Sequence, residues 1–345
     1  MAIQVSGTQV IGNSRELTNI ASVDATTAAS ITAAGVGGSS FLNEWTPTIL
    51  PQDSAWAVFA ETSGAIIFLG GTATSVAVST NGVTYTQPST FSGIPAYKDS
   101  AYNPSNNLLV VVGNNGYYFG EHNMVYTSDN GSSWGRLAVT NSGNSRFASI
   151  DYSGSLWVAG GQSGRYGTST NGTSWTDRGT QGSTDLGCIR YLNGLWFMSN
   201  GDTLYTSSSG TGSWTARMSS IITLKAIAYY NNMYVAAGSG GYYTSTNGTS
   251  WSALKTLPGD AGFEDVVYNS SVGLWLGAYR TNGSAYFGPA ILTTTDPTDV
   301  YSWKWNQYYN GEAATQYATR LAFTDYGSYP SRMINVSRGP RFTPL

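Results

Sequence analysis

The feature of this chain that most constrains its fold is a short phrase that recurs along the sequence. Residues 169–175 (Ser-Thr-Asn-Gly-Thr-Ser-Trp) return unchanged at 245–251. Residues 79–85 and 128–134 are looser copies, and residues 207–214 are a degraded copy that is one residue longer. Self-similarity at a fixed period is typical of repeat architectures, in which each copy adds one structural unit.

Each repeat unit contains four short apolar or aromatic segments separated by turn residues. In one unit these segments are 147–152, 156–161, 165–169 and 175–178, and their lengths suit strands of a small sheet. We expect Asn171-Gly172 to supply positive φ angles at a two-residue hairpin between the third and fourth strands. A four-stranded antiparallel sheet cannot bury both its faces alone, so its repetition around an axis predicts an all-β fold, the β-propeller.

The number of blades follows from the aromatic residues that close the units. These are Tyr85, Trp134, Trp175, Trp214, Trp251 and Trp303, and Trp45 lies one period before the first. After Trp303 only an opening pair of strands remains, at 317–323 and 332–336, with a short tail at 341–343 as a third strand. We therefore predict a seven-bladed β-propeller of four-stranded antiparallel blades, whose last blade is completed by an N-terminal strand at 41–48. Such closure hides sheet edges. Six blades with a loose N-terminal strand is the alternative.

Composition excludes several classes of function. The net charge is −3 and the 16 Lys and Arg residues are dispersed, which argues against nucleic-acid binding. One histidine, His122, and one cysteine, Cys188, cannot furnish a zinc site, and we expect Cys188 to be a small buried hydrophobe. No run reaches the ~18 apolar residues that span a bilayer. We therefore expect no metal, no cofactor and no membrane insertion.

The repeated phrase resembles the Asp-box of sialidase-like and related propellers, whose pattern is Ser-X-Asp-X-Gly-X-Thr-Trp. The copies here carry Asn where that motif has Asp, and the Gly lies one residue closer to the Ser. The resemblance covers residues 65–303 and implies the propeller fold, with the box as a turn between third and fourth strands. It does not fix an activity, because one fold serves many functions.

Residues 3–20 resemble the opening of tail-fibre and other virion proteins of tailed bacteriophages. There a phrase Gly…Val-Ile-X-X-Ser-Arg-X-Leu-X-Asn-Ile begins an assembly segment, and it is matched here from Gly7 to Ile20. The resemblance implies an assembly segment at 1–40 before a propeller at 41–345, a place in the virion, contacts with other tail or capsid proteins, and a homotrimer by analogy with fibres. The expected assembly residues are Ile3, Val5, Val10, Ile11, Arg15, Leu17 and Ile20. The alternative is that this segment folds back on the flank of its own propeller.

The sequence does not favour an enzyme. Sialidase-like catalysis would need three arginines around a carboxylate, but the arginines here are scattered, with Arg136 and Arg178 after fourth strands and Arg190 and Arg320 in first strands. Glycosidases need two facing carboxylates. The acids at early positions in the blades are expected to solvate the mouth of the central channel: Asp99, Asp151, Glu264 and Asp265. We predict no catalytic residue; a propeller glycosidase that acts through a channel acid is the alternative.

Two blades are longer than the others, and both carry insertions between the second and third strands, at 114–123 and 279–288. Antiparallel connectivity places these insertions at the opposite face from the Asn-Gly turns. Aromatic residues among Asn, Ser and Gly are typical of sugar or adaptable protein recognition. The expected ligand-binding residues are Tyr117, Tyr118, Phe119, His122, Arg280, Tyr286 and Phe287. The alternative is that these aromatic rings pack on one another and order their own loops.

Together these patterns predict a bacteriophage virion structural protein that is attached through its N-terminal segment and contacts a host-surface glycan or receptor through its propeller. The alternative from a structural class is a decoration protein that covers the capsid or tail and binds no receptor.

Overall fold

The computed structural model describes residues 3–5, 8–11, 56–70, 76–81, 84–88, 97–113, 124–127, 130–137, 146–257, 262–270, 273–280, 290–307, 317–324 and 332–338. The chain divides into two units, Met1–Pro47 and Thr48–Leu345. In the first unit, β1 (Ile3–Val5) and β2 (Thr8–Ile11) form an antiparallel pair in which Ile3 lies opposite Ile11.

The described part of the second unit forms seven antiparallel sheets, which we number as blades in chain order. Blade 1 holds β3 (Trp56–Glu61), β4 (Ile66–Gly70) and β5 (Val76–Ser79). Blade 2 holds β6 (Tyr97–Asn103), β7 (Leu108–Gly113), β8 (Met124–Thr127) and β9 (Gly135–Leu137). Blade 3 holds β10 (Phe147–Tyr152), β11 (Trp157–Gly161), β12 (Arg165–Ser169) and β13 (Thr176–Thr180). Blade 4 holds β14 (Leu186–Leu192), β15 (Leu195–Asn200), β16 (Thr203–Ser207) and β17 (Thr215–Met218).

Blade 5 holds β18 (Leu224–Tyr230), β19 (Met233–Gly238) and β20 (Gly241–Ser245). Blade 6 holds β21 (Gly262–Asn269), β22 (Leu274–Arg280), β23 (Ala290–Thr294) and β24 (Lys304–Gln307), and blade 7 holds β25 (Tyr317–Thr324) and β26 (Arg332–Arg338). Among the residues that the structure describes, the fourth position of blades 1 and 5 holds a single bridge, in which Thr86 pairs with Val78 and Lys255 with Tyr242. Short 3-10 turns are η2 (Gln162–Gly164) and η3 (Val300–Ser302).

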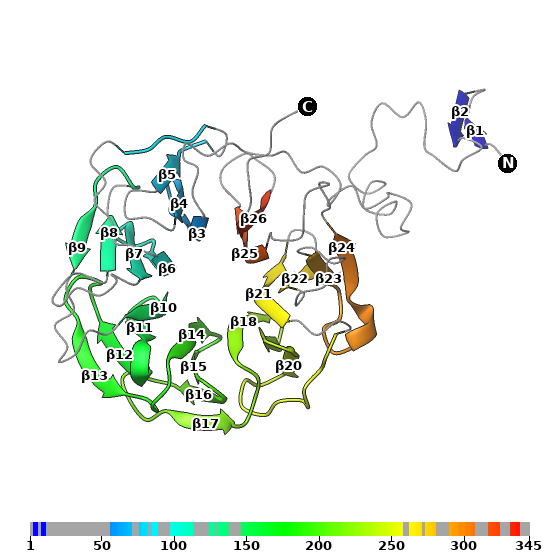
Figure 1. Ribbon diagram of the computed structural model, residues 1–345. Coiled ribbons are helices and arrows are strands. Elements are labelled where there is room, and N and C mark those ends of the chain that lie inside the picture. Colours follow the sequence, from blue (N-terminus) through cyan, green and yellow to red (C-terminus); the bar gives the residue numbers. More distant parts are fainter. Residues whose placement is uncertain are drawn as a thin grey trace. The chain divides into compact units, whose positions relative to one another are not determined.

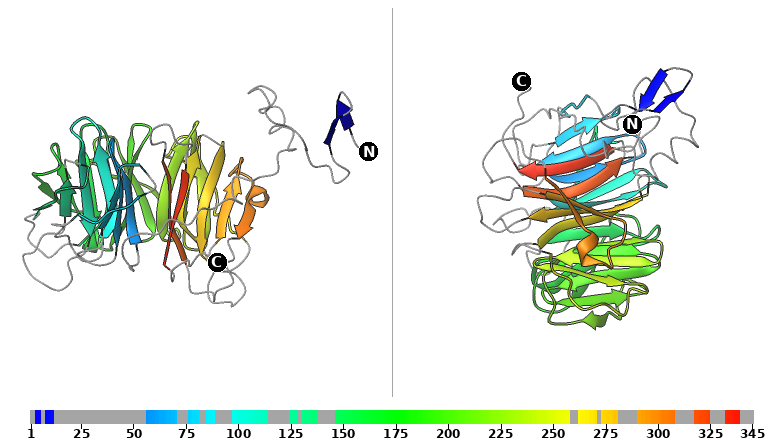
Figure 2. Two further views of the ribbon diagram at one scale, coloured as in Figure 1. Left: turned by 90° about the horizontal axis from the view of Figure 1, so that it is seen from above. Right: turned by 90° about the vertical axis from the view of Figure 1, so that its right-hand side faces the viewer.

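The seven sheets are arranged as a ring around one axis (Figure 1). The first strand of each blade contacts the first strand of the next, and β25 of blade 7 contacts β3 of blade 1. Figure 2 shows these inner strands running along the axis when the ring is seen from its side. The structure therefore confirms the predicted all-β propeller, and its seven sheets agree with the predicted blade number. The predicted closing strand at 41–48 and the tail at 341–343 lie outside the described residues.

The hydrophobic core lies between neighbouring blades. In one cluster, Leu108 and Val110 of blade 2 are buried together with Ile150 and Trp157 of blade 3. Similar clusters join blades 1 and 2, 3 and 4, 4 and 5, and 5 and 6. Because second strands are covered on both faces, they are continuous apolar runs; every residue of β7 is buried. Cys188 is buried in the cluster between blades 4 and 5, as expected.

The repeated phrase forms a longer turn than the two-residue hairpin that the sequence predicts, so that prediction is wrong. Between β12 and β13 the connection covers residues 170–175. Ser169 Oγ accepts a hydrogen bond from Gly172 N at 2.8 Å, and Asn171 Oδ1 accepts from Thr173 N at 3.0 Å and Ser174 N at 2.8 Å. Only Gly172 of the Asn-Gly pair has a positive φ, of 79°. The carboxamide takes the N–H groups that a tight hairpin would pair across the strands.

The second strong copy of the phrase repeats this geometry. Gly248 N donates to Ser245 Oγ at 2.9 Å, and Ser250 N donates to Asn247 Oδ1 at 2.8 Å. The Asn oxygen is therefore the acceptor that orders the turn, at the position where the Asp-box has Asp. As the resemblance implies, the turn joins third to fourth strands. No helix in the described ranges is long and apolar enough to cross a membrane.

Candidate functional site

All seven inner strands are irregular at the same place. A register shift falls after the first or second residue of each pair with the second strand, for example between Tyr97 and Asp99 in blade 2 and between Phe147 and Ser149 in blade 3. Because the shift occurs in every blade, the first residue after it marks the same structural position in all seven inner strands. The residues that follow it are Val58, Asp99, Ser149, Cys188, Ala226, Asp265 and Arg320.

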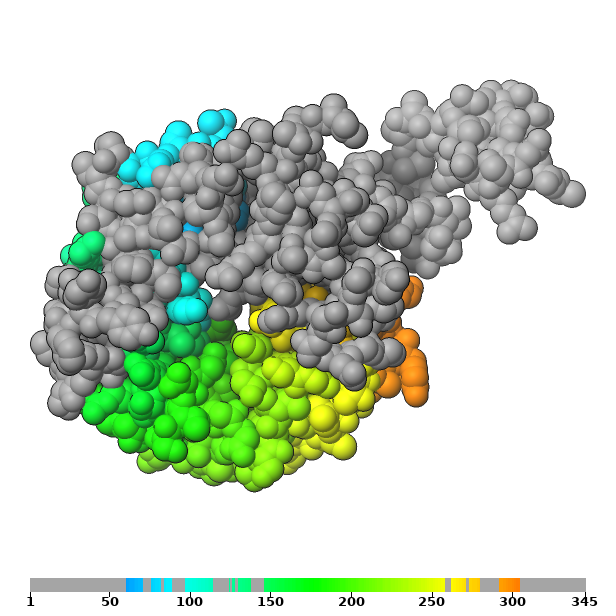
Figure 3. Space-filling model, in the orientation of Figure 1, coloured from blue at the N-terminus to red at the C-terminus, as the bar shows by residue number. Residues whose placement is uncertain are grey.

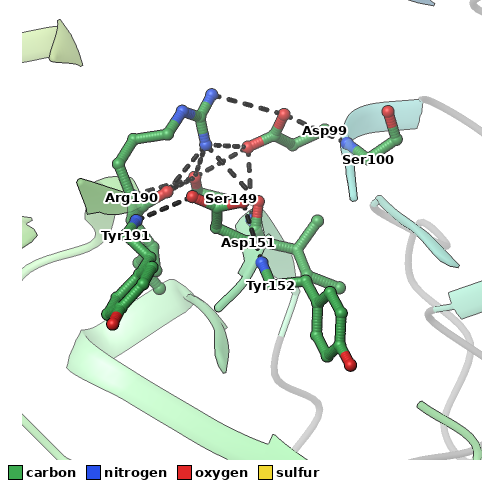
Figure 4. A network of polar contacts seen from close by, with 9 residues as sticks. Asp99, Ser100, Ser149, Asp151, Tyr152, Arg190 and Tyr191 are labelled. Atoms are coloured by element: carbon green, nitrogen blue, oxygen red, sulfur yellow. Dashed lines mark hydrogen bonds and ion pairs between the residues drawn. The ribbon is translucent and has the colours of Figure 1, made fainter. Parts of the chain in front are cut away.

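Polar residues at and near this position connect three successive blades (Figure 4). The Asp99 carboxylate on β6 accepts hydrogen bonds from Ser149 Oγ at 2.8 Å and Ile150 N at 3.2 Å, both on β10. It also accepts from Arg190 Nη1 on β14 at 2.8 Å. Ser149 Oγ in turn accepts from Ile189 N at 2.9 Å. We name Asp99, Ser149, Asp151 and Arg190 the inner-strand network.

The inner-strand network satisfies backbone groups that the sheets leave unpaired. An innermost strand has one free edge, and its buried N–H groups need acceptors. Asp99 serves Ile150 N of the next blade, and Ser149 serves Ile189 N of the blade after that. Asp151 lies two positions further along β10 and accepts from Tyr191 N at 2.7 Å. Each of these side chains therefore fastens its own blade to the following one.

The electrostatics of the inner-strand network follow from its burial. The side chains of Arg190 and Asp99 are 22% and 9% exposed. Burial lowers the pKa of Arg190 and is the largest single effect, but the charge of Asp99, its hydrogen bond and the charges of Cys188 and Asp151 together outweigh burial, so that the net pKa is raised and the guanidinium stays charged. Burial also raises the pKa of Asp151 to about 6, against the opposing effects of Arg190 and the Tyr191 and Tyr152 N–H groups. Asp151 therefore titrates within two units of neutral pH.

The contacts of the two carboxylates are those of structural groups. Asp99 is bound by a guanidinium, a hydroxyl and the backbone N–H groups of Ile150 and Ser100, and Asp151 is bound by the N–H groups of Tyr191 and Tyr152. Two facing carboxylates, one of them a proton donor, would be needed for glycoside hydrolysis. The arrangement instead favours a rigid junction of blades 2, 3 and 4.

The other two acids singled out in the sequence lie on β21 of blade 6. Asp265 is buried at the position equivalent to Asp99, and its Oδ1 accepts from Val266 N at 2.9 Å. Glu264 is the preceding residue and is partly exposed. No group of three or more His, Cys, Asp or Glu side chains within the described ranges is placed to hold a metal ion.

The predicted ligand-binding residues fall mostly outside the described part of the chain. This holds for Tyr117, Tyr118, Phe119, His122, Tyr286 and Phe287; Arg280 is the last residue of β22. The connections that carry them join β7 to β8 and β22 to β23, which are second and third strands, as the sequence predicts. Both connections therefore leave the same end of the ring, opposite to the Asn-Gly turns.

The predicted assembly residues divide in the same way. Ile3 and Val5 lie on β1, and Val10 and Ile11 lie on β2. The remaining three lie outside the described residues: Arg15, Leu17 and Ile20.

Sequence reasoning missed the inner-strand network, although it noted several of its members. An alignment of the first strands places Asp99, Ser149 and Cys188 in one column, with Asp151 and Arg190 together two columns later. In this alignment a carboxylate (Asp99) is followed in the next blade by a hydroxyl (Ser149) and in the blade after that by an arginine two columns away (Arg190). That series of polar residues was the signal from which their contact could have been predicted.

No protein-family model matches the sequence, and no curated protein matches it. Among solved structures, YCF48 from Cyanidioschyzon merolae is similar, with a TM-score of 0.61 and 14% identity over 85% of this chain and 96% of that chain. The WD40 repeats of RRP9 are similar with a TM-score of 0.62 and 9% identity over 86% of this chain and 92% of that chain. The GH74 enzyme of Niastella koreensis is similar with a TM-score of 0.53 and 19% identity over 83% of this chain and 43% of that chain. At these identities the likeness shows the fold alone: this chain is a β-propeller.

Proposed function

We propose that this chain is a structural protein of a tailed-bacteriophage virion, held to the particle by its N-terminal unit, with a propeller that contacts the host surface. The observation that carries the proposal is the division of the chain at Pro47. The unit before that point contains the phrase that resembles phage assembly segments, and the unit after it is a propeller. Attachment to tail or capsid proteins and a homotrimeric state are parts of the same proposal.

The face of the propeller that carries the two insertions is the proposed host contact. Loops on a rigid scaffold are the usual place for binding residues, because they vary without cost to the core. The insertion after β7 contains Tyr117 and that after β22 contains Tyr286, each among Asn, Gly and Ser. Flat rings beside amide and hydroxyl groups suit a glycan or an adaptable receptor.

The proposal needs no catalytic role for Asp99 or Asp151. Asp99 and Asp151 already accept hydrogen bonds from the neighbouring blades, so their geometry is explained by the junction they make. The proposed function therefore assigns them no step of chemistry.

Two measurements on the full chain test the proposal. Imaging of the intact phage particle with labelled protein should locate the chain on tail or capsid, and Leu17→Asp with Ile20→Asp should remove it from the particle. Binding to host cells should fall at least about tenfold in the Tyr117→Ala/Tyr286→Ala variant, since buried aromatic anchors dominate binding energy.

Tyr301→Ala is the matched control for the host-binding test. Tyr301 is 92% exposed on the β23–β24 connection, which leaves the opposite end of the ring. Its loss should leave host binding unchanged. Full binding by the double variant would reject the insertion face, and absence of the chain from the particle would reject the virion assignment.

A further inference from the structure

Two arginines on the outer strands of neighbouring blades share one arrangement. Arg178 on β13 donates from Nε to Thr168 Oγ1 at 2.8 Å, and Arg217 on β17 donates from Nε to Thr206 Oγ1 at 2.7 Å. Both threonines are 2% exposed, and both arginines are exposed. The same contact occurs in two successive blades, so it is a feature of the repeat.

Both arginines also occur where the outer strand is bulged. In blade 4, Ala216 lies opposite Tyr205 and Met218 opposite Leu204, so Arg217 between them has no residue opposite it. In blade 3 a register shift in the β12–β13 pairing falls at the same place and includes Arg178. Bulges at sheet edges re-aim a side chain. Here each bulge brings an arginine Nε onto a buried threonine.

This contact leaves the terminal nitrogens of both guanidinium groups available. Within the described residues, neither Arg178 nor Arg217 donates a hydrogen bond from Nη1 or Nη2, and neither forms an ion pair. The acid next to Arg178, Asp177, is already paired with Arg165 at 3.5 Å. Ala216 stands at that place beside Arg217. Because Nε is fixed, the planar fork is held before any ligand arrives, which lowers the entropic cost of binding.

We infer that the outer rim of blades 3 and 4 binds the anionic groups of an acidic polysaccharide through Arg178 and Arg217. The guanidinium fork matches the oxygens of a carboxylate or sulfate in a bidentate fashion. A polymer that repeats such groups engages both arginines at once, and the second contact adds avidity. The outer strands β13 and β17 follow one another along the rim (Figure 1), and on the face of the ring that Figure 3 shows, blades 3 and 4 adjoin as one continuous green area.

A nucleic acid is the other polymer with repeated anionic groups. The chain has a net charge of −3 and only 16 Lys and Arg residues, a balance that disfavours the counterion-release binding on which nucleic-acid affinity depends. The rim site is distinct from the insertion face and does not depend on the virion assignment, so the two proposals stand or fall separately.

Retention of the full chain on immobilised polymers at low salt tests the inference. Dextran sulfate and alginate present sulfate and carboxylate groups respectively, and dextran is the neutral control. We expect retention by at least one acidic polymer and none by dextran. Arg178→Gln/Arg217→Gln should lower the affinity about tenfold, because both forks are lost.

Substitution of the two threonines distinguishes binding by positioned arginines from binding that depends only on net charge. Thr168→Val/Thr206→Val keeps every charge and the shape of the side chain but removes both acceptors, and we expect an affinity about threefold lower because the forks are no longer fixed. Arg136→Gln is the matched control. Arg136 is exposed on β9 of blade 2 and pairs in regular register with Val125, without a bulge. Its replacement should have less effect than either single change at Arg178 or Arg217.

Three results would overturn the inference. Retention of the Arg178→Gln/Arg217→Gln protein as strongly as the parent, with unchanged thermal unfolding, would show that the two arginines do not bind the polymer. Equal loss in Arg136→Gln, with no effect of the threonine changes, would reduce the binding to unspecific charge. Equal retention on double-stranded DNA would remove the polysaccharide as the ligand class.

Discussion

Asp99 on β6 and Arg190 on β14 form an ion pair of 2.8 Å across 91 positions of sequence, with the whole of blade 3 inserted between their blades. The pair reaches over β10, whose Ser149 Oγ bonds to both residues. A single contact thus fixes the spacing of three inner strands.

Removal of one partner of this pair should be costly. Asp99→Ala leaves the mostly buried Arg190 without its counter-ion and Ile150 N without its acceptor, and we expect a loss of about 3 kcal/mol in the free energy of unfolding. Arg165→Gln is the control, because the Arg165–Asp177 pair is 25% and 28% exposed and should contribute less than about 1 kcal/mol. Urea unfolding measures both, and losses of equal size would contradict the structural role of the inner-strand network.

The raised pKa of Asp151 predicts a pH dependence of stability. Its ordinary value is 3.8 and burial raises it to about 6, so between these values the folded state binds more protons than the unfolded state. Stability from this group is therefore complete below about pH 4 and falls as the pH rises through 6. In Asp151→Asn this contribution should be absent, so that the variant gains stability relative to the parent between pH 4 and 6. A difference that stays constant from pH 4 to 8 in urea unfolding would exclude the shift.

The turn at residues 170–175 lies close to the preceding blade, and substitution of its glycine should therefore lower the stability of the protein. A Cβ at Gly172 would lie 2.6 Å from Leu108 Cδ2 of blade 2, and the φ of Gly172 is +79°. We expect Gly172→Ala to cost about 3 kcal/mol through overpacking and backbone strain together. Gly154 has a φ of +93° with nothing within 4 Å of its Cβ position, so Gly154→Ala should cost only about 1 kcal/mol. Thermal unfolding of the two variants compares them directly; similar losses would show that contact with Leu108 is unimportant.

The acceptor role of Asn171 predicts an asymmetry between two substitutions. Asn171→Asp keeps an oxygen for Thr173 N and Ser174 N and should change stability by less than about 0.5 kcal/mol. Asn171→Ala removes the acceptor of these two hydrogen bonds and of a third, from Ser169 Oγ at 3.1 Å, and should cost about 1 kcal/mol. Chemical unfolding of both proteins is the measurement, and an alanine variant as stable as the aspartate variant would count against the turn geometry.

Much of the fold could be predicted from the sequence because its signals are local. The alternation of strands and turns in residues 147–178 predicted four strands, and the structure has them as β10 to β13. The turn at Asn171 was assigned to the right pair of strands but to the wrong type. Its conformation depends on where the Asn171 carboxamide finds donors, and residue preferences alone do not determine that.

The inner-strand network could not be predicted in the same way. Its members Asp99, Ser149 and Arg190 come from three blades, and each taken alone is an ordinary strand residue. Only the common register of the inner strands places them together. The hydrogen bond of Arg178 to Thr168 could not be predicted either, because it requires a bulge in β13 and no turn residue in the sequence indicates that bulge.

Asp99 accepts a hydrogen bond from Ile150 N of the next blade, and Ser149 accepts one from Ile189 N of the blade after that. The acceptor side chain always lies on the earlier blade, so these contacts run in one direction around the ring. The backbone N–H groups on the free edge of each inner strand are matched to acceptors on the preceding blade, so blades 2, 3 and 4 are not interchangeable modules despite their shared sequence pattern. Shuffling or duplicating one of them would present a hydroxyl where a carboxylate is required, or an arginine with no counter-charge. The order of these blades is thus fixed by side chains on the innermost strands, and the turn at Gly172 adds a second contact with the preceding blade through Leu108.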